Sequence, residues 1–461
     1  MRKHGIFGTL ALTVALSACG TNGTQSPNLG STVSPEYVEG ELLVQLNAGL
    51  SAQSVTSLET QLGVQMVERL ATTDGSPLYL ARITNGRSVD QAIQAISANS
   101  SVRFAEKNWI YQHTATSSDP YFTNGNLWGT YGDESSPANQ YGSQAAEAWA
   151  AGHTGSKNIV IGVIDEGIQY THPDLSGQVG NPGELPFGAN GRDDDGNGYV
   201  DDLYGWDFDG NDNTVYDGGT RGSLDDHGTH VAGTIGAKAN SEGIAGVNWN
   251  VTMISGKFLG RRGGTTANAV KAVDYFTDLK TKSGLNVVAT NNSWGGGGYS
   301  QALYDAIERA NRAGILFIAA AGNGGSDGVG DDNDKTPHYP SSYTNANIIA
   351  VAAITSSGAK STFSNYGKTS VDIGAPGSGI WSTTAYNTYS SYNGTSMATP
   401  HVTGAAALYA SVHPSASASQ IRDALVSKDV DTNSLSLTGP TPVASSGRLN
   451  VAKALGLDPL Q

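Results

Sequence analysis

The sequence predicts an α/β fold in which helices cover both faces of a parallel sheet, preceded by a small α+β unit. Beyond residue 119, short strands that are apolar throughout alternate with helical segments. Strands without polar alternation are typical of a parallel sheet that is buried on both faces. The 60 glycines and the charged fraction of only 15% among 461 residues favour a compact chain with many tight turns over a disordered or coiled-coil one.

The first 19 residues are typical of an export signal. A basic dipeptide precedes a largely apolar run over residues 6–16, which is too short to span a bilayer as a permanent helix. The run ends in LSAC, which resembles a bacterial lipobox in which Cys19, the single cysteine of the chain, would be acylated. An ordinary secretory signal cleaved near Ala18 is the alternative. Residues 20–36, rich in Gly, Ser, Thr and Pro, are interpreted as a linker.

Residues 37–113 are predicted to form the compact α+β unit. The segment VDQAIQAI has apolar residues at positions i, i+3, i+4 and i+7, the spacing of one helix face. Expected strands cover residues 40–46, 78–83 and 102–111, and expected helices cover residues 51–62 and 89–96. The polar segment at residues 114–119 is interpreted as a seam before the second domain, residues 119–461.

The second domain supplies the alternating elements of the parallel sheet. Expected strands cover residues 159–164, 251–258, 287–289, 315–320 and 348–353. Expected helices cover residues 227–237, 267–279 and 301–313, with a further helix after Ser396. No segment beyond the signal is predicted to span a membrane, so membrane attachment is expected only through a lipid on Cys19.

The charge balance argues against one class of partner and for another. There are 26 basic and 41 acidic residues, a net charge of −15. Nucleic-acid binding is therefore not expected, because phosphate contacts need basic patches. Many of the acidic residues are clustered, which points to a hard cation.

Four side chains at strand ends and helix starts could perform acyl transfer. Active residues of open α/β sheets collect at the carboxyl ends of strands, where Asp165 and Asn323 follow apolar runs. A serine nucleophile needs a base and an orienting carboxylate. Ser396 near a helix start, His227 and Asp165 can fill these roles, and the Asn323 amide can donate to an oxyanion.

Each residue alone has a plainer interpretation. Asp165 and Ser396 could be helix caps, and Asn323 could belong to an Asn-Gly turn. His227 and His230 form an i, i+3 pair that could bind a metal. The joint occurrence of nucleophile, base, orienting acid and oxyanion donor favours catalysis over these alternatives.

The motifs VIDEGIQYTHPDL, DHGTHVAGTI, AAAGN and NGTSMATPHVTGAAAL, in that order, resemble the subtilisin family of serine endopeptidases, with thermitase-like features. The resemblance covers residues 119 to about 455, and residues 37–113 resemble the family's inhibitory propeptide. It implies the four catalytic roles above, protein or peptide substrates, and a propeptide that inhibits its own enzyme. We expect a monomer. Glu166 departs from the family, which more often has a small hydroxyl residue there, and its charge predicts a raised pKa of His227.

The resemblance also implies how a substrate would lie. An extended peptide would pair with two flanking segments through main-chain groups. These segments are Gly263, Gly264 and Thr265 on one side, and Ser293, Trp294 and Gly295 on the other. His338 could narrow the main side-chain pocket or be a surface-loop histidine.

Two acidic constellations predict structural calcium. Asp193, Asp195, Asn197 and Asp201 place oxygen donors at alternating positions around a glycine, which resembles the start of an EF-hand loop. Tyr204 stands where a bidentate Glu would be expected, and a solvated acidic loop is the alternative.

The second constellation rests on the thermitase-like resemblance. That resemblance implies ligand side chains from Asp119, Asp174 and Asn240, and ligand carbonyls from Ala237, Glu242 and Ile244.

Two rival functions are disfavoured. An α/β-hydrolase esterase would have Gly-x-Ser-x-Gly and a different order of catalytic residues, whereas Ser396 is followed by Met and Ala. A non-catalytic binding protein would be expected to lack one of the catalytic residues. The sequence therefore predicts an exported serine endopeptidase that matures from its precursor by self-cleavage, with a lipid-anchored precursor and an extracellular or periplasmic mature enzyme.

Overall fold

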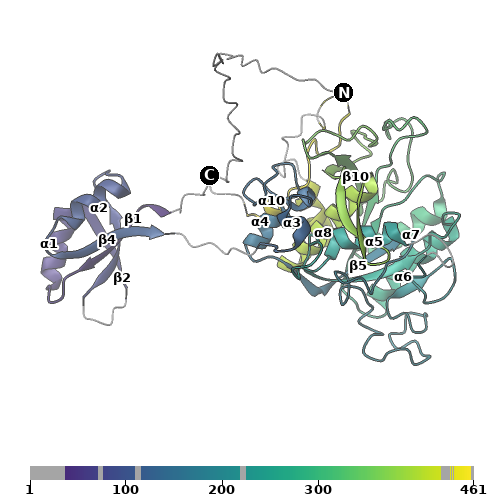
Figure 1. The fold of residues 1–461 in the computed structure, drawn as a ribbon, viewed down its shortest axis with the longest axis horizontal. Coiled ribbons are helices and arrows are strands. Elements are labelled where there is room, and N and C mark those ends of the chain that lie inside the picture. The colour runs from purple at the N-terminus through teal and green to yellow at the C-terminus, as the bar shows by residue number, and fades with distance from the viewer. Residues whose placement is uncertain are drawn as a thin grey trace, which may run out of the picture. The chain divides into compact units, whose positions relative to one another are not determined.

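A computed structural model describes residues 37–70, 76–109, 116–218, 225–426, 437, 439 and 441–457. The chain separates into two compact units, Met1–Tyr111 and Gln112–Gln461, whose elements are labelled in Figure 1. The expected signal, the lipobox at Cys19 and the linker lie outside the described residues. Within the described part of the chain, no helix is long and apolar enough to cross a bilayer.

The first unit is a four-stranded antiparallel sheet with two helices, in the order β2-β3-β1-β4. Its elements are β1 (Tyr37–Leu46), α1 (Ala52–Leu62), β2 (Val64–Leu70), β3 (Leu78–Ile83), α2 (Val89–Ser97) and β4 (Val102–Trp109). Helix α2 begins with a capping box, in which Ser88 and Gln91 satisfy each other's main-chain N–H groups. The predicted α+β class is confirmed, and β2 was not predicted.

The second unit contains a seven-stranded sheet in the order β11-β10-β9-β8-β5-β7-β6, in which every described pairing is parallel. The strands are β5 (Gly155–Asp165), β6 (Gly205–Asp207), β7 (Asn250–Lys257), β8 (Val287–Asn292), β9 (Leu316–Ala320), β10 (Ile348–Ile354) and β11 (Ile373–Pro376). The predicted parallel sheet is confirmed.

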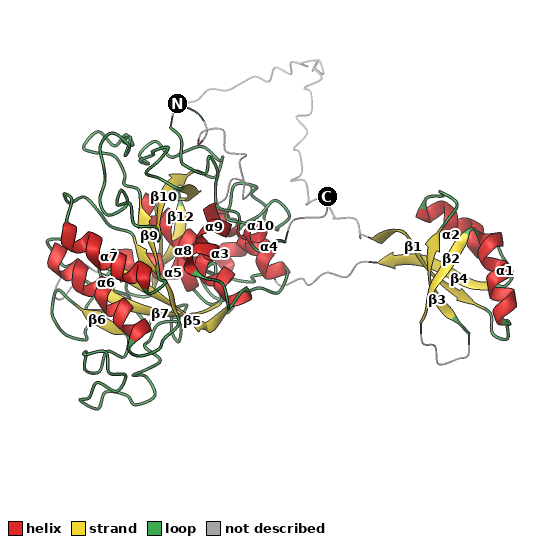
Figure 2. Ribbon diagram, turned by 180° about the vertical axis from the view of Figure 1, so that it is seen from behind, coloured by secondary structure: helices red, strands yellow, loops and turns green. Residues whose placement is uncertain are grey.

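Helices cover both faces of this sheet. The main ones are α5 (Asp226–Gly236), α6 (Thr266–Thr281), α7 (Gln301–Arg312) and α8 (Thr395–Val412). Shorter elements are α3 (Pro120–Thr123), η1 (Trp128–Thr130), α4 (Ala145–Ala150), α9 (Ala418–Val426), α10 (Val451–Ala454) and the hairpin of β12 (Ile380–Thr384) and β13 (Thr388–Tyr392). Figure 2 shows α6 and α7 side by side.

The two faces of β5 belong to two different cores. Ile161 and Val163 pack in a cluster with residues of α5 and α8, whereas Val160 and Ile164 pack in a cluster with residues of α6 and α7. This is why residues 159–164 of the strand have no polar side chain, rather than one at every second position. A Cβ on Gly162 would lie 2.7 Å from the Phe276 ring, so the glycine allows α6 to approach the sheet closely.

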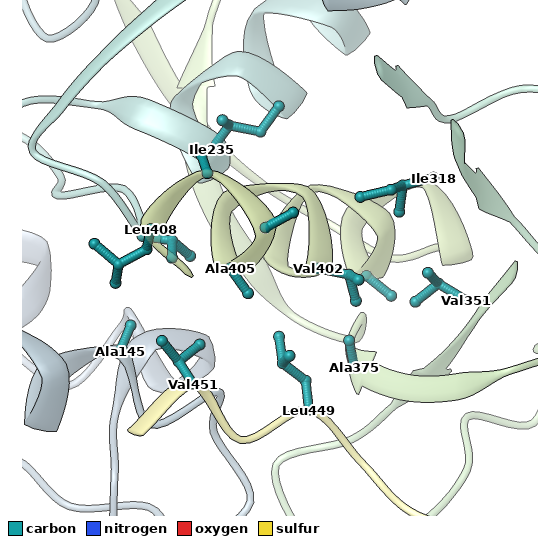
Figure 3. Packing of buried hydrophobic residues seen from close by; sticks show 14 of the residues in the cluster. Ala145, Ile235, Ile318, Val351, Ala375, Val402, Ala405, Leu408, Leu449 and Val451 are labelled. Atoms are coloured by element: carbon teal, nitrogen blue, oxygen red, sulfur yellow. The ribbon is translucent and has the colours of Figure 1, made fainter. Parts of the chain in front are cut away.

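Helix α8 is buried along most of its length, and this packing holds the start of the helix rigidly. Figure 3 shows Val402, Ala405 and Leu408 of α8 between Ile235 of α5 and Leu449. Leu408 is fully buried, and truncating such a side chain to Ala typically costs about 2–5 kcal/mol. Because the helix is fixed by this packing, Ser396 in its first turn is fixed as well.

Candidate active site

Asp165 and His227 are joined at the carboxyl end of β5. Asp165 is the last residue of the strand and is fully buried, and His227 lies in the first turn of α5. The His227 Nδ1 and Asp165 Oδ1 atoms are 2.9 Å apart. The His227 side chain keeps 31% of its surface exposed. An imidazole that donates Nδ1–H to a buried carboxylate presents its other nitrogen as a base.

Two acidic groups act on the pKa of His227. Burial lowers this pKa, but the Asp165 carboxylate and then Glu166 raise it, with a net result of about 9. Glu166 Oε1 also accepts a hydrogen bond from the main-chain N–H of His227, at 2.7 Å. The effect expected of Glu166 is therefore present, although Asp165 makes the larger contribution.

Ser396 is tied to the end of β8, the strand beside β5. Its Oγ donates to the Ser293 carbonyl at 3.1 Å, and the Ser293 Oγ donates to the Ser396 carbonyl at 2.8 Å. Pro400, inside α8, cannot supply the N–H that would normally reach the Ser396 carbonyl. The Ser293 hydroxyl takes over that role and fixes the first turn of α8.

Asn323 and the main-chain N–H of Ser396 border one space. The Asn323 Oδ1 accepts hydrogen bonds from the Thr395 N–H at 2.8 Å and from the Thr395 Oγ at 3.0 Å. This orients the Nδ2 group as a donor, and a Cβ on Gly394 would lie 3.6 Å from Nδ2 and 3.5 Å from the Ser396 nitrogen. Two donors converging beside a nucleophile are what an oxyanion requires.

The buried His230 side chain of α5 contacts the β12–β13 hairpin. Its Nε2 lies 2.9 Å from the Ile380 carbonyl and 3.1 Å from the Ser390 carbonyl, and its ring stacks on Tyr392. Burial lowers the pKa of His230 to about 3, with His227 adding to the effect. In this structure the buried imidazole secures the β12–β13 hairpin to α5.

The two segments expected to flank a substrate follow β7 and β8, the strands on either side of β5. Gly263, Gly264 and Thr265 form an exposed turn after β7, and Thr265 caps α6. Ser293, Trp294 and Gly295 follow β8 directly.

His338 packs against the second of these segments. A Cβ on Gly295 would lie 2.3 Å from the His338 ring, and one on Gly322 would lie 3.0 Å from it. The half-buried imidazole thus fills the space between these two glycines.

The comparisons with known proteins agree with this geometry. Residues 156–447 match the subtilase family, and residues 25–108 match the fervidolysin N-terminal prodomain. The chain belongs to the subtilase family. It is a serine-type endopeptidase with an N-terminal prodomain, and is made as a precursor.

Similar proteins share most of the length of this subtilase. It is 32% identical over 426 residues to a thermophilic serine proteinase of Bacillus sp. (strain AK1), which covers 89% of this chain and 90% of that protein. It is 35% identical over 346 residues to thermitase of Thermoactinomyces vulgaris, covering 74% and 99%. A solved protease of Pseudoalteromonas arctica superposes with a TM-score of 0.55 at 26% identity, covering 74% of this chain and 99% of that one.

The subtilase also has a buried ion group that sequence reasoning missed. Lys257, the last residue of β7, lies 2.6 Å from Asp225 and 3.0 Å from Asp217, and all three side chains are at most 4% exposed. Asp225 immediately precedes α5 and adopts a left-handed conformation, with φ of 60°. Lys257 is also paired in register with Asp165 across β5 and β7. The ion group therefore fixes the start of the helix that carries His227.

The residues that the thermitase-like resemblance implies as calcium ligands lie around one loop, which Asp119 and Asp174 both contact. Asp119 Oδ1 accepts hydrogen bonds from the N–H groups of Asn240 and Glu242, at 3.1 and 3.2 Å. Asp174 accepts from the Asn240 amide at 3.1 Å and from the Ile244 N–H at 3.0 Å. The Ala237 carbonyl, at the start of the same loop, accepts from the Gly246 N–H at 2.9 Å.

The acidic loop is arranged differently from an EF-hand. Asp193 accepts hydrogen bonds from three loop N–H groups, and Asp201 accepts from the Asn190 and Gly191 N–H groups. Asn197 donates its amide to Asp195 at 3.1 Å. Of the four predicted ligands, only Asp195 lies in a group of three carboxylates, whose other members, Glu184 and Asp202, were not predicted.

Proposed function

We propose that this subtilase hydrolyses peptide bonds through an acyl-enzyme on Ser396, with His227, Asp165 and Asn323 in the predicted roles. The Ser396 Oγ attacks the scissile carbonyl carbon while His227 accepts its proton, and Asn323 and the Ser396 N–H stabilise the oxyanion. The C–N bond then breaks and the leaving amine takes the proton from His227. Water, deprotonated by His227, releases the acyl group and restores the Ser396 hydroxyl.

The observation that carries this assignment is the 2.9 Å contact between buried Asp165 and His227. A fluorophosphonate probe tests it, because the probe modifies an activated serine. The wild-type enzyme should be labelled, Ser396→Ala should not be, and Ser326→Ala, which removes an exposed loop serine near Asn323, should label normally. Equal labelling of wild type and Ser396→Ala would refute the assignment.

The prodomain match supports self-processing of the precursor at the polar seam between about residues 113 and 119. Wild-type chain should be cut there, and N-terminal sequencing of the mature enzyme locates the bond. Ser396→Ala should accumulate uncut in a host lacking other proteases. Normal cutting of that variant in such a host would mean that another enzyme performs the step.

Calcium in the loop around Asp119 and Asp174 is part of the proposal. Both carboxylates are fully buried, and the structure records no ion pair for either among the described residues. Burial raises the pKa of Asp174 and the nearby Asp119 charge adds to this, so a bound cation would offset an electrostatic cost. Hard oxygen donors suit calcium, which would stabilise the fold and take no part in the chemistry.

A membrane-tethered precursor is the proposed starting point. The support is the lipobox-like sequence at Cys19 and the Gly-, Ser-, Thr- and Pro-rich segment that precedes the first strand of the α+β unit. Cutting near residues 113–119 would separate the lipid from the catalytic domain, so that a soluble extracellular or periplasmic enzyme is released. Cys19→Ser should move the precursor from the membrane to the soluble fraction without changing the size of the mature enzyme. Mature activity that stays on the membrane after loss of the propeptide would contradict the release step.

A further inference from the structure

Three acidic side chains that the peptidase mechanism does not use meet in the long segment between β5 and β6. Glu184, Asp195 and Asp202 each offer a carboxylate oxygen, and these oxygens lie within 4.8 Å of one another. Glu184 and Asp202 are fully buried and Asp195 is half-buried. Three carboxylates at this spacing repel one another strongly inside a protein.

Among the residues that the structure describes, one oxygen of this group has no hydrogen-bond partner. Glu184 Oε1 accepts from the Asp194 and Asp195 N–H groups at 2.7 and 3.1 Å. Glu184 Oε2 is buried and accepts no hydrogen bond within the described part of the chain. A buried carboxylate oxygen without a protein partner is rare and costly, and in folded proteins such an atom commonly contacts a bound ion or an ordered water.

The described side chains that hydrogen-bond to Asp202 are two amides and a tyrosine hydroxyl, which carry no positive charge. The Asn181 and Asn197 amides donate to Asp202 at 3.1 and 2.9 Å. Their own oxygens are engaged by loop N–H groups, at 2.9 Å for Asn181 and 2.7 Å for Asn197. The amides are thus fixed with their amino groups towards the carboxylates, and no lysine or arginine ion pair with the three acids is recorded among the described residues.

We propose that Glu184, Asp195 and Asp202 bind one hard divalent cation of the calcium class. Carboxylate oxygens are the ligands that such cations prefer, and water would complete the coordination. The ligand set differs from the one that the loop sequence predicts, because the carboxylates of Asp193 and Asp201 do not belong to the group of three oxygens within 4.8 Å. The Tyr275 hydroxyl of α6 donates to Asp202, so the cation would link this loop to the helical layer. The inference does not depend on the catalytic assignment.

Calcium stoichiometry tests the site directly. The purified full chain carrying Ser396→Ala, which prevents self-digestion, is stripped with chelator, dialysed against calcium and analysed for bound metal. Adding Glu184→Gln should lower the bound calcium by one ion per chain. Adding Asp174→Asn should remove the ion of the other proposed calcium site, so a chain that carries both Glu184→Gln and Asp174→Asn should lose two ions.

Terbium luminescence gives a second readout, because Tyr275 is a sensitiser placed next to Asp202. Tyr389 contacts Asp174 at the other proposed calcium site, so the titration uses a Ser396→Ala chain that also carries Asp174→Asn. Terbium bound to this chain should emit on aromatic excitation, and Glu184→Gln should raise the dissociation constant of that terbium ion at least tenfold. Tyr275→Phe should reduce the emission while leaving calcium stoichiometry unchanged. If Glu184→Gln fails to fold, Asp195→Asn at the half-buried position replaces it. Unchanged stoichiometry and terbium titration in the folded variant would overturn the proposal.

Discussion

Lys257 Nζ lies 2.6 Å from Asp225, which precedes His227 by two residues, and both charged side chains are buried. Replacing Lys257 by Met would remove the ammonium group that faces the buried Asp225 carboxylate. Breaking a buried ion pair in this way typically costs about 3–5 kcal/mol. Urea unfolding of the Ser396→Ala chain, with and without Lys257→Met, measures the change in the free energy of unfolding.

The matched control for that experiment is Lys282→Met. Lys282 pairs with Asp278 at 2.8 Å, but its side chain is 55% exposed. Removing an exposed pair should cost no more than about 1 kcal/mol. Equal losses in the two variants would show that the Lys257 group does not fix the α5 start.

Glu166→Gln should shift the pH dependence of hydrolysis. The general base must be neutral, so the acid limb of kcat/KM follows the pKa of His227 in the free enzyme. The Asp165 and Glu166 charges raise that pKa to about 9. Removing one of these charges lowers the pKa, so the acid limb should move to lower pH, by roughly 0.5–1 pH unit.

Glu166→Asp keeps the charge and is the control for the pH profile. It should leave the acid limb close to that of wild type, even if kcat changes because the hydrogen bond to the His227 N–H is altered. An acid limb that stays in place in Glu166→Gln would mean that Glu166 does not contribute to the pKa of His227.

Asn323→Ala should lower kcat and leave KM nearly unchanged, because the amide donates to charge that forms only in the transition state. Loss of one such donor typically lowers kcat by about 10²–10³-fold. Thr395→Val is the graded control, since it removes the hydroxyl that orients Asn323 but keeps the Thr395 N–H bond. Its loss should be smaller. A large rise in KM at constant kcat in Asn323→Ala would instead indicate a ground-state binding role.

Chelator should lower the thermal midpoint of the mature enzyme, because a site that binds only the folded state stabilises it by about 2.7 kcal/mol at a hundredfold excess of ligand over its dissociation constant. Asp174→Asn should reduce this response, since Asp174 is a buried member of the proposed site. The comparison is made by calorimetry with and without chelator. The same drop in Asp174→Asn as in wild type would remove Asp174 from the ligand set.

The sequence predicts those parts of the fold whose signal is local. Strand β5 is apolar on both faces because two cores flank it, so its pattern and the carboxylate that ends it are visible in the sequence. Strand β2 was missed because Val64 is its only fully buried residue, and an edge strand with one buried position has no clear alternation. The β12–β13 hairpin was missed as well; the buried His230 that anchors it binds from a helix far away in the chain.

The site shows the same division. Asp165, His227, Asn323 and Ser396 each stand at a strand end or helix start with a recognisable motif. Asp225 and Lys257 meet only because β7 lies beside β5, a neighbour relation that spacing does not reveal. Glu184 lies nine residues before the acidic run in the sequence, and the path of the loop brings it close to Asp195. The alternating oxygen donors therefore pointed to this loop, but they did not predict that Glu184 belongs to its group of three carboxylates.

The exchange of hydrogen bonds between Ser293 and Ser396 makes two distant positions depend on each other. Because Pro400 has no main-chain N–H, the Ser293 hydroxyl donates a hydrogen bond to the Ser396 carbonyl in its place. In a directed-evolution library, position 293 should therefore tolerate Ala poorly while Pro400 is present. A chain with Ala at position 400 would regain the helical N–H and release that restriction. Ala at position 293 should therefore be tolerated when Ala at position 400 is introduced first, and poorly tolerated in the reverse order.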